Sequence, residues 1–351
     1  MYKIINFNEK EKWDEIVKSF ENNDVYFLWG YINSFKINGD GKPELFYFEN
    51  ENGRVINIFF KRDISKCESF IGKIEENKFF DIATPYGYGG PIFEGENIEN
   101  LINSYTQVFN EYCKKSNIIS EFIRFNPMIE NEKNKLNGYE IINIRETVYM
   151  DLSKGEEYIW SDLIGKKRTN IRKALKNNIE IKYGNNKDYI NDFVQLYKRT
   201  MEKDNAVEYY YFSDEFFYET LENLKDNLLI FVAEFEEKII AATMILYNDK
   251  FVHYHLSGSD ENFSRLSANN LMLYEVAKWG VENEKKLFHL GGGYSSSDDS
   301  LFKYKSEFSK ENRFDFCIGK KVHNQDEYNN LVEIREKNSR IPDGFFPKYR
   351  A

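Results

Sequence analysis

The first 145 residues alternate between stretches of hydrophobic and polar positions with strand spacing and stretches with helical spacing. Helix 9–20, for example, places Trp13, Ile16, Val17 and Phe20 on one face. The same spacing predicts strands over 2–8, 44–49, 54–60, 79–84 and 121–127, and further helices over 26–37 and 97–115. The turn sequence at 50–53 joins two of these strands into a hairpin. The pattern predicts a mixed α/β lobe with a largely antiparallel sheet.

From Glu146 this order begins again. Strands are expected over 147–152, 179–183, 228–235, 238–247, 250–259, 287–290 and 313–322, and helices over 156–177, 187–204, 213–225, 268–284 and a short stretch ending at Lys305. Helices that lead into a three-strand meander, followed by a crossover helix and a further strand, follow the order of the acetyltransferase (GNAT) fold. We therefore predict an α/β (α+β) chain with two GNAT-like domains, each a mixed, largely antiparallel sheet flanked by helices. The predicted domains are 1–145 and 146–335, with 336–351 as a C-terminal tail.

The composition excludes several classes of protein. A chain of 351 residues with 41% hydrophobic residues can build two cores, and its formal charge of −10 opposes nonspecific coating of nucleic acid. Cys67, Cys113 and Cys317 lie too far apart for a disulfide framework or a zinc site. The sequence lacks the pattern of a signal peptide or a membrane span, so we expect a cytoplasmic protein with no integral membrane segment.

A strongly basic helix is predicted at the start of the second lobe. Six cations lie within eleven positions, namely Lys166, Lys167, Arg168, Arg172, Lys173 and Lys176. At about 100° per residue, five of them share one arc, and apolar residues occupy the neighbouring arc. Like charges at this spacing repel, and an anionic ligand would offset that repulsion. Two interpretations stay open: a phosphate-binding face and a solvated basic face.

The second candidate is the loop from Gly291 to Lys305. Three glycines follow a strand, and Asp299 or Ser300 is expected to cap the next helix. The glycines fit either a ligand-lining backbone or a plain strand-to-helix turn. Lys303 and Lys305 near its end are candidates to meet an anion or a developing oxyanion.

Other chemistries find little support in the residues. His253, His255 and His289 lack a further ligand at metal spacing, so we predict no metal. No motif for nucleotide hydrolysis, dinucleotide binding, serine hydrolysis or zinc proteolysis is present. A GNAT domain that binds acyl-CoA usually has a glycine-rich loop before its crossover helix. Residues 261–270 contain Arg265 but no glycine, which indicates a different acyl donor.

The chain resembles the Fem family of peptidoglycan interpeptide-bridge aminoacyltransferases, which pair two GNAT-like domains. The resemblance covers most of the chain and is strongest in the second lobe. It rests on the order and spacing of FLWGYINSFK, YGYGGP, FIRFNP, the basic helix followed by IEIKYG, LIFVAEFEEKIIAATMIL and LFHLGGGYSSSDDSLFKYKSEF. Three features depart from the family: Asn126 stands where an Asp is usual, a helical coiled-coil insertion is absent, and the match at Lys36 is ambiguous by a residue or two.

The resemblance implies roles for particular residues. Lys305 and Tyr304 are the implied catalytic residues, with Lys305 stabilising a tetrahedral intermediate. Lys36, Arg168, Arg172 and Lys176 are implied to bind the diphosphate of the acceptor. Asn126, Gly291, Gly292 and Tyr254 complete the predicted substrate-binding set.

The implied function is transfer of an amino acid from aminoacyl-tRNA to the stem-peptide amine of a UDP-linked or lipid-linked muropeptide. No cofactor is implied beyond the aminoacyl-tRNA co-substrate, and the implied place is the cytoplasm, including the inner face of the membrane. Two alternatives remain: a GNAT-type N-acyltransferase that uses acyl-CoA on a small amine or polysaccharide precursor, and a non-catalytic binder of tRNA or a nucleotide-sugar.

Overall fold

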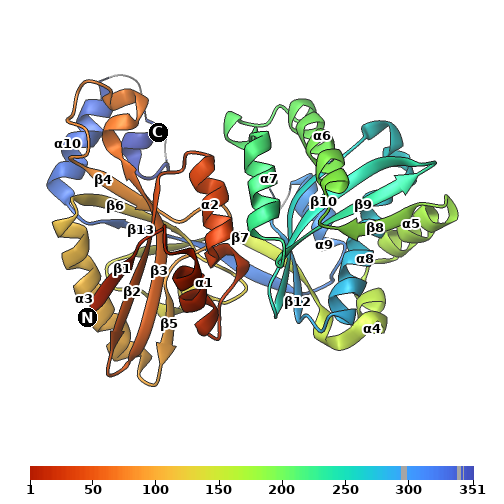
Figure 1. The fold of residues 1–351 in the computed structure, drawn as a ribbon, viewed down its shortest axis with the longest axis horizontal. Helices are drawn as coiled ribbons and strands as arrows, with labels where there is room; N and C mark the ends of the chain where they lie inside the picture. Colours follow the sequence, from red (N-terminus) through yellow and green to blue (C-terminus); the bar gives the residue numbers. More distant parts are fainter. Residues whose placement is uncertain (294–298, 338–340, 343) are drawn as a thin grey trace. The chain divides into compact units, whose positions relative to one another are not determined.

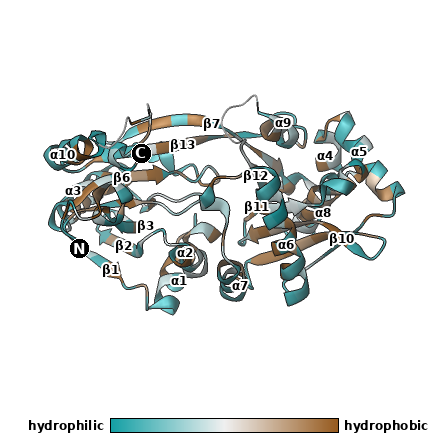
Figure 2. Cartoon of the chain, turned by 90° about the horizontal axis from the view of Figure 1, so that it is seen from above, coloured by the Kyte–Doolittle hydropathy of each residue, from teal (hydrophilic) through white to brown (hydrophobic). Residues whose placement is uncertain are grey.

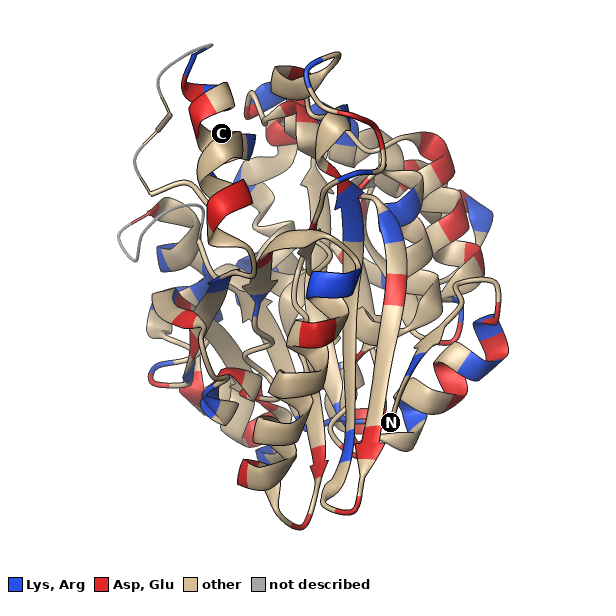
Figure 3. Cartoon of the chain, turned by 90° about the vertical axis from the view of Figure 1, so that its left-hand side faces the viewer, with Lys and Arg blue, Asp and Glu red and all other residues tan. Residues whose placement is uncertain are grey.

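The computed structural model describes residues 1–293, 299–337, 341–342 and 344–351. They form two compact units (Figure 1): unit 1 comprises Met1–Ile144 and Phe316–Ala351, and unit 2 comprises Arg145–Asp315. Within the described part of the chain, no helix is long and apolar enough to cross a membrane, and no group of His, Cys, Asp and Glu residues could hold a metal ion. Basic and acidic residues are interspersed on the face shown in Figure 3.

The sheet of unit 1 is mixed, with strand order β1-β2-β3-β4-β6-β13 and β5 paired to β3. Only the β4–β6 pair is parallel among the pairs of these strands. The strands are β1 (Tyr2–Ile5), β2 (Lys42–Asn50), β3 (Gly53–Asp63), β4 (Phe80–Ala83), β5 (Ile92–Gly95), β6 (Ile118–Arg124) and β13 (Arg313–Val322). The helices are α1 (Lys10–Ser19), α2 (Trp29–Ile37), α3 (Ile98–Lys115) and α10 (Gln325–Glu336). The predicted helix 26–37 begins as a separate 3-10 turn, Val25–Phe27.

Aromatic side chains build the core of unit 1. The apolar stripe of α3 packs on the sheet, with Tyr105, Phe109 and Tyr112 against Phe46 and Phe59. Their spacing at four and three residues places them on one helical face, which explains why the helix 97–115 was readable from the sequence.

The C-terminal residues differ from their predicted assignment. We expected 316–335 in the second domain and 336–351 as a tail, but the structure assigns Phe316–Ala351 to unit 1. The reason is pairing and burial: β13 runs antiparallel to β6, and Leu331 of α10 packs with Ile64 and Phe70. Tyr349 is fully buried, and its hydroxyl lies 2.7 Å from the Ser120 hydroxyl.

Unit 2 contains the strand order β7-β12-β11-β10-β9-β8, with β11–β12 as its parallel pair, and the first residues of β7 belong to unit 1. The strands are β7 (Glu140–Asp151), β8 (Glu180–Gly184), β9 (Leu228–Phe235), β10 (Lys238–Tyr247), β11 (Phe251–Ser259) and β12 (Leu287–Gly291). The helices are α4 (Gly155–Asp162), α5 (Gly165–Lys176), α6 (Lys187–Lys203), α7 (Asp214–Asn223), α8 (Ala268–Glu282) and α9 (Ser300–Ser306). Most of β10 is coloured as hydrophobic in Figure 2, in keeping with its buried positions.

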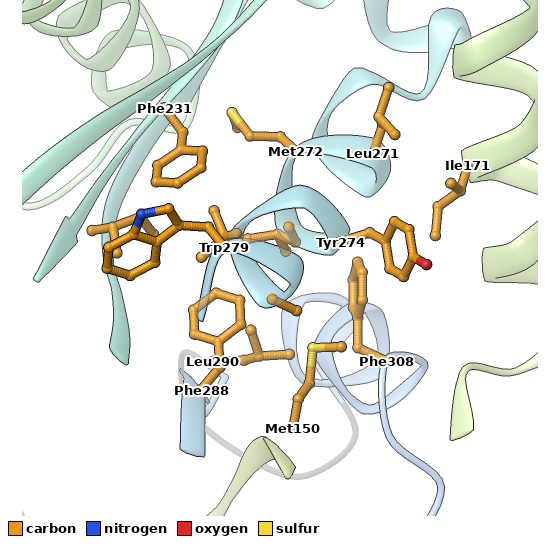
Figure 4. Packing of buried hydrophobic residues seen from close by; sticks show 14 of the residues in the cluster. Met150, Ile171, Phe231, Leu271, Met272, Tyr274, Trp279, Phe288, Leu290 and Phe308 are labelled. Atoms are coloured by element: carbon orange, nitrogen blue, oxygen red, sulfur yellow. The ribbon is translucent and has the colours of Figure 1, made fainter. Parts of the chain in front are cut away.

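Helix α8 is the centre of the core of unit 2 (Figure 4). Phe231 of β9 packs on one side of it, and Ile171 of α5, Tyr274 and Phe308 gather on the other. Because side chains alternate along a strand, the buried Ile230 and Val232 point to the opposite face, along which α6 runs.

The predicted single helix 156–177 is two helices. Leu163 and Ile164 have extended backbone angles between α4 and α5. Leu163 is fully buried in the core of unit 2, and Gly165 follows it with a low helix propensity. The break lets Leu163 turn into the core, and it starts the basic helix at Gly165.

Candidate active site

Strands β11 and β12 of unit 2 pair at the start of β11 and part after His253, near the carboxyl end of β12. Their parallel pairing covers Phe251–His253 against Leu287–His289. Next to this point β11 has a bulge: Met244 of β10 opposes Leu256 and Ile245 opposes Tyr254, so His255 is the extra residue. Ligands of open α/β sheets bind outside the carboxyl ends of strands, and bulges are enriched beside active sites. The described geometry therefore favours the point where β11 and β12 part as the candidate active site.

The glycine turn after β12 brings Lys305 to this place. Gly291 has a φ of +78°, and α9 begins where Asp299 accepts a 2.7 Å hydrogen bond from the backbone N–H of Phe302. Lys305, buried at 8% exposure, donates from Nζ to the Gly292 carbonyl at 2.9 Å. A Cβ on Gly291 would lie 3.3 Å from the same Nζ, so glycine leaves room for the ammonium. Residues 294–298 of the predicted loop lie outside the described residues.

Tyr254 faces the same ammonium. The Nζ of Lys305 lies 5.5 Å from the centre of the Tyr254 ring, within the range of a cation–π contact. Four of the predicted site residues, namely Lys305, Gly291, Gly292 and Tyr254, are thus close together.

Burial sets the charge of this cluster. It lowers the pKa of Lys305 to about 8, although Asp299 partly offsets the effect. Burial, together with His253, lowers the pKa of His255 to about 3, and burial holds the pKa of His289 well below its ordinary value. At neutral pH Lys305 is therefore mainly protonated, whereas His255 and His289 are neutral.

Tyr304 brings a hydroxyl to the region of Lys305. This hydroxyl is buried and, among the residues that the structure describes, has no hydrogen-bond partner. Burial raises the pKa of Tyr304 well above its ordinary value, so the hydroxyl keeps its proton.

The predicted basic helix, α5, does not present all of its cations to solvent. Lys167 points inward and is 1% exposed. Arg168 donates to the carbonyls of Trp160, Ser161 and Leu163 at the end of α4. These contacts stabilise a helix terminus and leave Arg168 less available to a substrate.

The remaining cations of α5 differ in their availability. The guanidinium of Arg172 lies 5.1 Å from the centre of the Trp160 ring, and its residue is exposed. Lys176 is exposed in the last turn of the helix. Lys173 is also exposed in this last turn, so a phosphate-binding face on α5 reduces mainly to Arg172, Lys173 and Lys176.

Two predicted substrate-binding residues belong to unit 1. Lys36 is exposed on α2, with Nζ 4.9 Å from the centre of the Phe7 ring. Asn126 is fully buried: its Nδ2 donates to Asp24 at 2.7 Å, and its Oδ1 accepts from the backbone N–H of Met128 at 2.9 Å. Internal hydrogen bonds thus account for the side chain of Asn126 and give it a structural role.

Two features of this region were not predicted from the sequence, namely the inward position of Lys167 and the bulge at His255. A signal for Lys167 was present, because Lys167, Ile171 and Ala174 follow the i, i+4, i+7 spacing of a buried helix face. The extra residue of a bulge leaves no comparable mark in the hydrophobic pattern.

Comparisons with known proteins agree with this architecture. Residues 165–306 match the model of the acetyltransferase (GNAT) domain family. A search of curated protein sequences finds no significant match. The matched segment contains the parting strands, α8 and α9, so the family match confirms the prediction of an acyltransferase domain of GNAT type in unit 2.

Solved structures extend the likeness to nearly the whole chain. The chain is similar to FemX, with 13% identity, a TM-score of 0.69, and coverage of 94% of this chain and 99% of that one. It is also similar to L-PGS from Bacillus licheniformis, with 14% identity, a TM-score of 0.56, and coverage of 95% and 98%. The C-terminal domain of a proposed lysylphosphatidylglycerol synthetase from Agrobacterium fabrum gives 12% identity, a TM-score of 0.56, and coverage of 92% and 94%. At these identities the likeness concerns the fold, and it confirms the predicted tandem GNAT-like, Fem-like fold.

Proposed function

We propose that this chain is an aminoacyltransferase that moves an amino acid from aminoacyl-tRNA to the stem-peptide amine of a peptidoglycan precursor. The observation that carries the proposal is the position of Lys305. Its buried ammonium lies at the glycine turn where β11 and β12 part, within a fold shared with FemX. A fixed positive charge in a water-poor site is most effective where negative charge develops in a transition state.

The proposed reaction needs few groups from the protein. The neutral acceptor amine attacks the ester carbonyl of the donor, and a C–N bond forms as the carbonyl oxygen becomes an oxyanion. Collapse of this tetrahedral species breaks the C–O ester bond, and the amine proton passes to the ribose oxygen that leaves. Lys305 would stabilise the oxyanion, and the hydroxyl of Tyr304 would donate a second hydrogen bond. Positioning of the two substrates would supply most of the remaining acceleration.

The donor is inferred from the start of α8. In place of a glycine-rich loop, the chain has a 3-10 helix, Glu261–Leu266, followed by Ser267 in the left-handed conformation. A glycine-rich turn exposes several backbone N–H groups to a pyrophosphate, whereas a 3-10 helix uses its own N–H groups internally. This feature favours an aminoacyl ester over acyl-CoA as the donor.

The acceptor is inferred from charge. Arg172 and Lys176 of α5 are the cations that we propose as contacts to the diphosphate of a nucleotide-linked or lipid-linked muropeptide. On unit 1, Lys36 remains our proposed acceptor contact, to be tested separately by its own Ala variant.

A single-turnover assay tests the proposal. The protein is mixed with a panel of tRNAs charged with labelled amino acids, and label is followed onto UDP-muropeptide, lipid-linked muropeptide and phosphatidylglycerol vesicles. We expect label on a muropeptide, and a large loss of transfer in the Lys305→Ala variant. A parallel melting experiment should show stabilisation by UDP-muropeptide and none by acetyl-CoA.

Each alternative outcome identifies a different function. Label on phosphatidylglycerol alone would show that the acceptor is a lipid and not a peptide. Strong stabilisation by acetyl-CoA together with acetyl transfer would show that the donor is acyl-CoA and not aminoacyl-tRNA. Binding of charged tRNA without transfer to any acceptor would leave a binding protein and refute the enzyme.

A further inference from the structure

The ammonium of Lys167 is buried in the core of unit 2, where four side chains surround it. It lies 3.5 Å from the centre of the Tyr304 ring and 4.3 Å from that of Phe308. It also donates to Asn270 Oδ1 of α8 at 2.9 Å and lies 3.3 Å from Glu307 Oε2. One side chain of α5 therefore holds α8 and the segment that contains α9 together.

Three of the four residues around this ammonium belong to the segment of Lys305. Tyr304 precedes Lys305, and Glu307 and Phe308 follow it within one helical turn. Helix α9 has seven residues, a length at which helices are unstable without tertiary contacts. The orientation of α9 therefore depends on what its side chains contact.

Burying an ammonium between these elements costs desolvation free energy. Burial lowers the pKa of Lys167 to about 8, with Glu307 opposing the shift. Apolar side chains of similar volume often replace a buried ion pair with no loss of stability. Removing Lys167 also leaves Glu307 with a partner, since Lys166 Nζ lies 3.1 Å from its Oε1. Stability alone gives little reason for a lysine here, whereas directional contacts to α9 do.

We propose that Lys167 is a positioning residue, which fixes α9 so that the Lys305 ammonium stays at the Gly292 carbonyl. The proposal rests on the proposed function where it concerns turnover, because Lys305 would be the group that touches the reacting carbonyl. It also changes the interpretation of the basic helix, since its most buried cation serves the catalytic segment instead of an acceptor phosphate.

The first test measures order in α9 without any substrate. Hydrogen–deuterium exchange is followed for peptides that cover 299–308 in the wild type, in Lys167→Met and in Lys198→Met. Lys198 pairs with Asp214 on the surface of unit 2 and serves as the matched control. We expect exchange in 299–308 to be about tenfold faster in Lys167→Met, with an unchanged melting temperature, and unaltered in the control. Equal exchange in all three proteins would overturn the proposal.

A second variant guards against misfolding. Asn270→Ala removes one hydrogen-bond acceptor from Lys167 and leaves the ammonium in place. We expect the same increase of exchange in 299–308 at smaller amplitude. If Lys167→Met does not fold, a normal exchange pattern in Asn270→Ala refutes the proposal.

The second test separates positioning from binding. With charged tRNA and muropeptide, Lys167→Met should lower kcat by about tenfold or more, because small misplacements of catalytic groups are costly, and leave both KM values within about twofold. Lys167→Arg should recover most of the lost kcat. A raised acceptor KM with unchanged kcat would make Lys167 a binding residue. If the wild type transfers nothing, the proposed function fails, while the exchange experiment still decides whether Lys167 orders α9.

Discussion

At the scale of single residues, the charge of Lys305 leads to a prediction about pH. Burial lowers its pKa to about 8, so it is protonated below that pH and loses its charge above it. An oxyanion needs the charged form, so the contribution of Lys305 to the rate of transfer falls as pH rises through about 8. The acceptor amine acts in the opposite sense, because it must lose a proton and an ordinary side-chain amine has a pKa of about 10. We therefore expect the rate of transfer to rise with pH up to about 8 and to level off above it, where the two effects offset each other.

Variants of Lys305 distinguish this residue from Lys167, whose pKa is also about 8. Lys305→Arg keeps its charge across the range, so its rate, although lower than that of the wild type, should keep rising above about pH 8. Lys305→Ala should lower kcat by about a hundredfold or more. A rate that still levels off at about pH 8 in Lys305→Arg would assign that break in the profile to another group.

The role of a residue was predictable where its own side chain determines the chemistry. It was not predictable where contacts with distant residues determine that role. The sequence pointed to Lys305 and its glycines, and the structure brings them together. The sequence also predicted that Asn126 binds the substrate. In the structure its amide instead donates a hydrogen bond to Asp24, which is distant in sequence. A partner 102 positions away cannot be read from a local pattern.

At the scale of elements, α5 leads to a prediction about binding. Lys176 is exposed in its last turn and forms no ion pair within the described residues. Replacing it by Ala should raise the KM for muropeptide by about tenfold and leave kcat unchanged, because a charge-assisted contact to phosphate is lost in both the ground and transition states. The effect should shrink at high salt. An unaltered KM in Lys176→Ala would leave α5 as a solvated basic surface.

Periodicity identified most elements but not their interruptions. The pattern of 156–177 continues through Leu163, because this residue is apolar in either conformation. Tertiary packing of Leu163 and the contacts of Arg168 at the end of α4 decide that the helix breaks there. Hydrophobic spacing records which residues are buried, and it does not record how the backbone brings them inside.

At the scale of the whole molecule, the C-terminal segment is predicted to stabilise unit 1. Tyr349 is fully buried beside Phe70 and Tyr328, and Arg350 forms an ion pair of 2.5 Å with the buried Asp81. Tyr349→Ala should cost about 3 kcal/mol of unfolding free energy, as large-to-small core substitutions do.

Denaturant titration with exchange mass spectrometry can localise that loss. Peptides of β6 and α10 should lose protection in Tyr349→Ala, whereas peptides of β9 to β11 should not. Equal losses in both units would show that the segment does not act through unit 1.

The two-domain organisation could be predicted because the order of elements repeats along the chain. The return of 316–351 to unit 1 could not be predicted, since strand 313–322 also fits as the last strand of a second GNAT-like sheet. Which sheet a final strand joins depends on long-range pairing, which periodicity does not encode.

That return has a consequence for synthesis. Unit 2 is one uninterrupted stretch of sequence between the two segments of unit 1. Its two ends are close together, because Tyr149 stacks on Phe314 with ring centres 4.3 Å apart. A ribosome releases all of unit 2 before β13 is complete, and domains fold as units during translation. Unit 2 can therefore mature first. Until β13 arrives, β6 is an open edge, at which the nascent chain can pair with another chain.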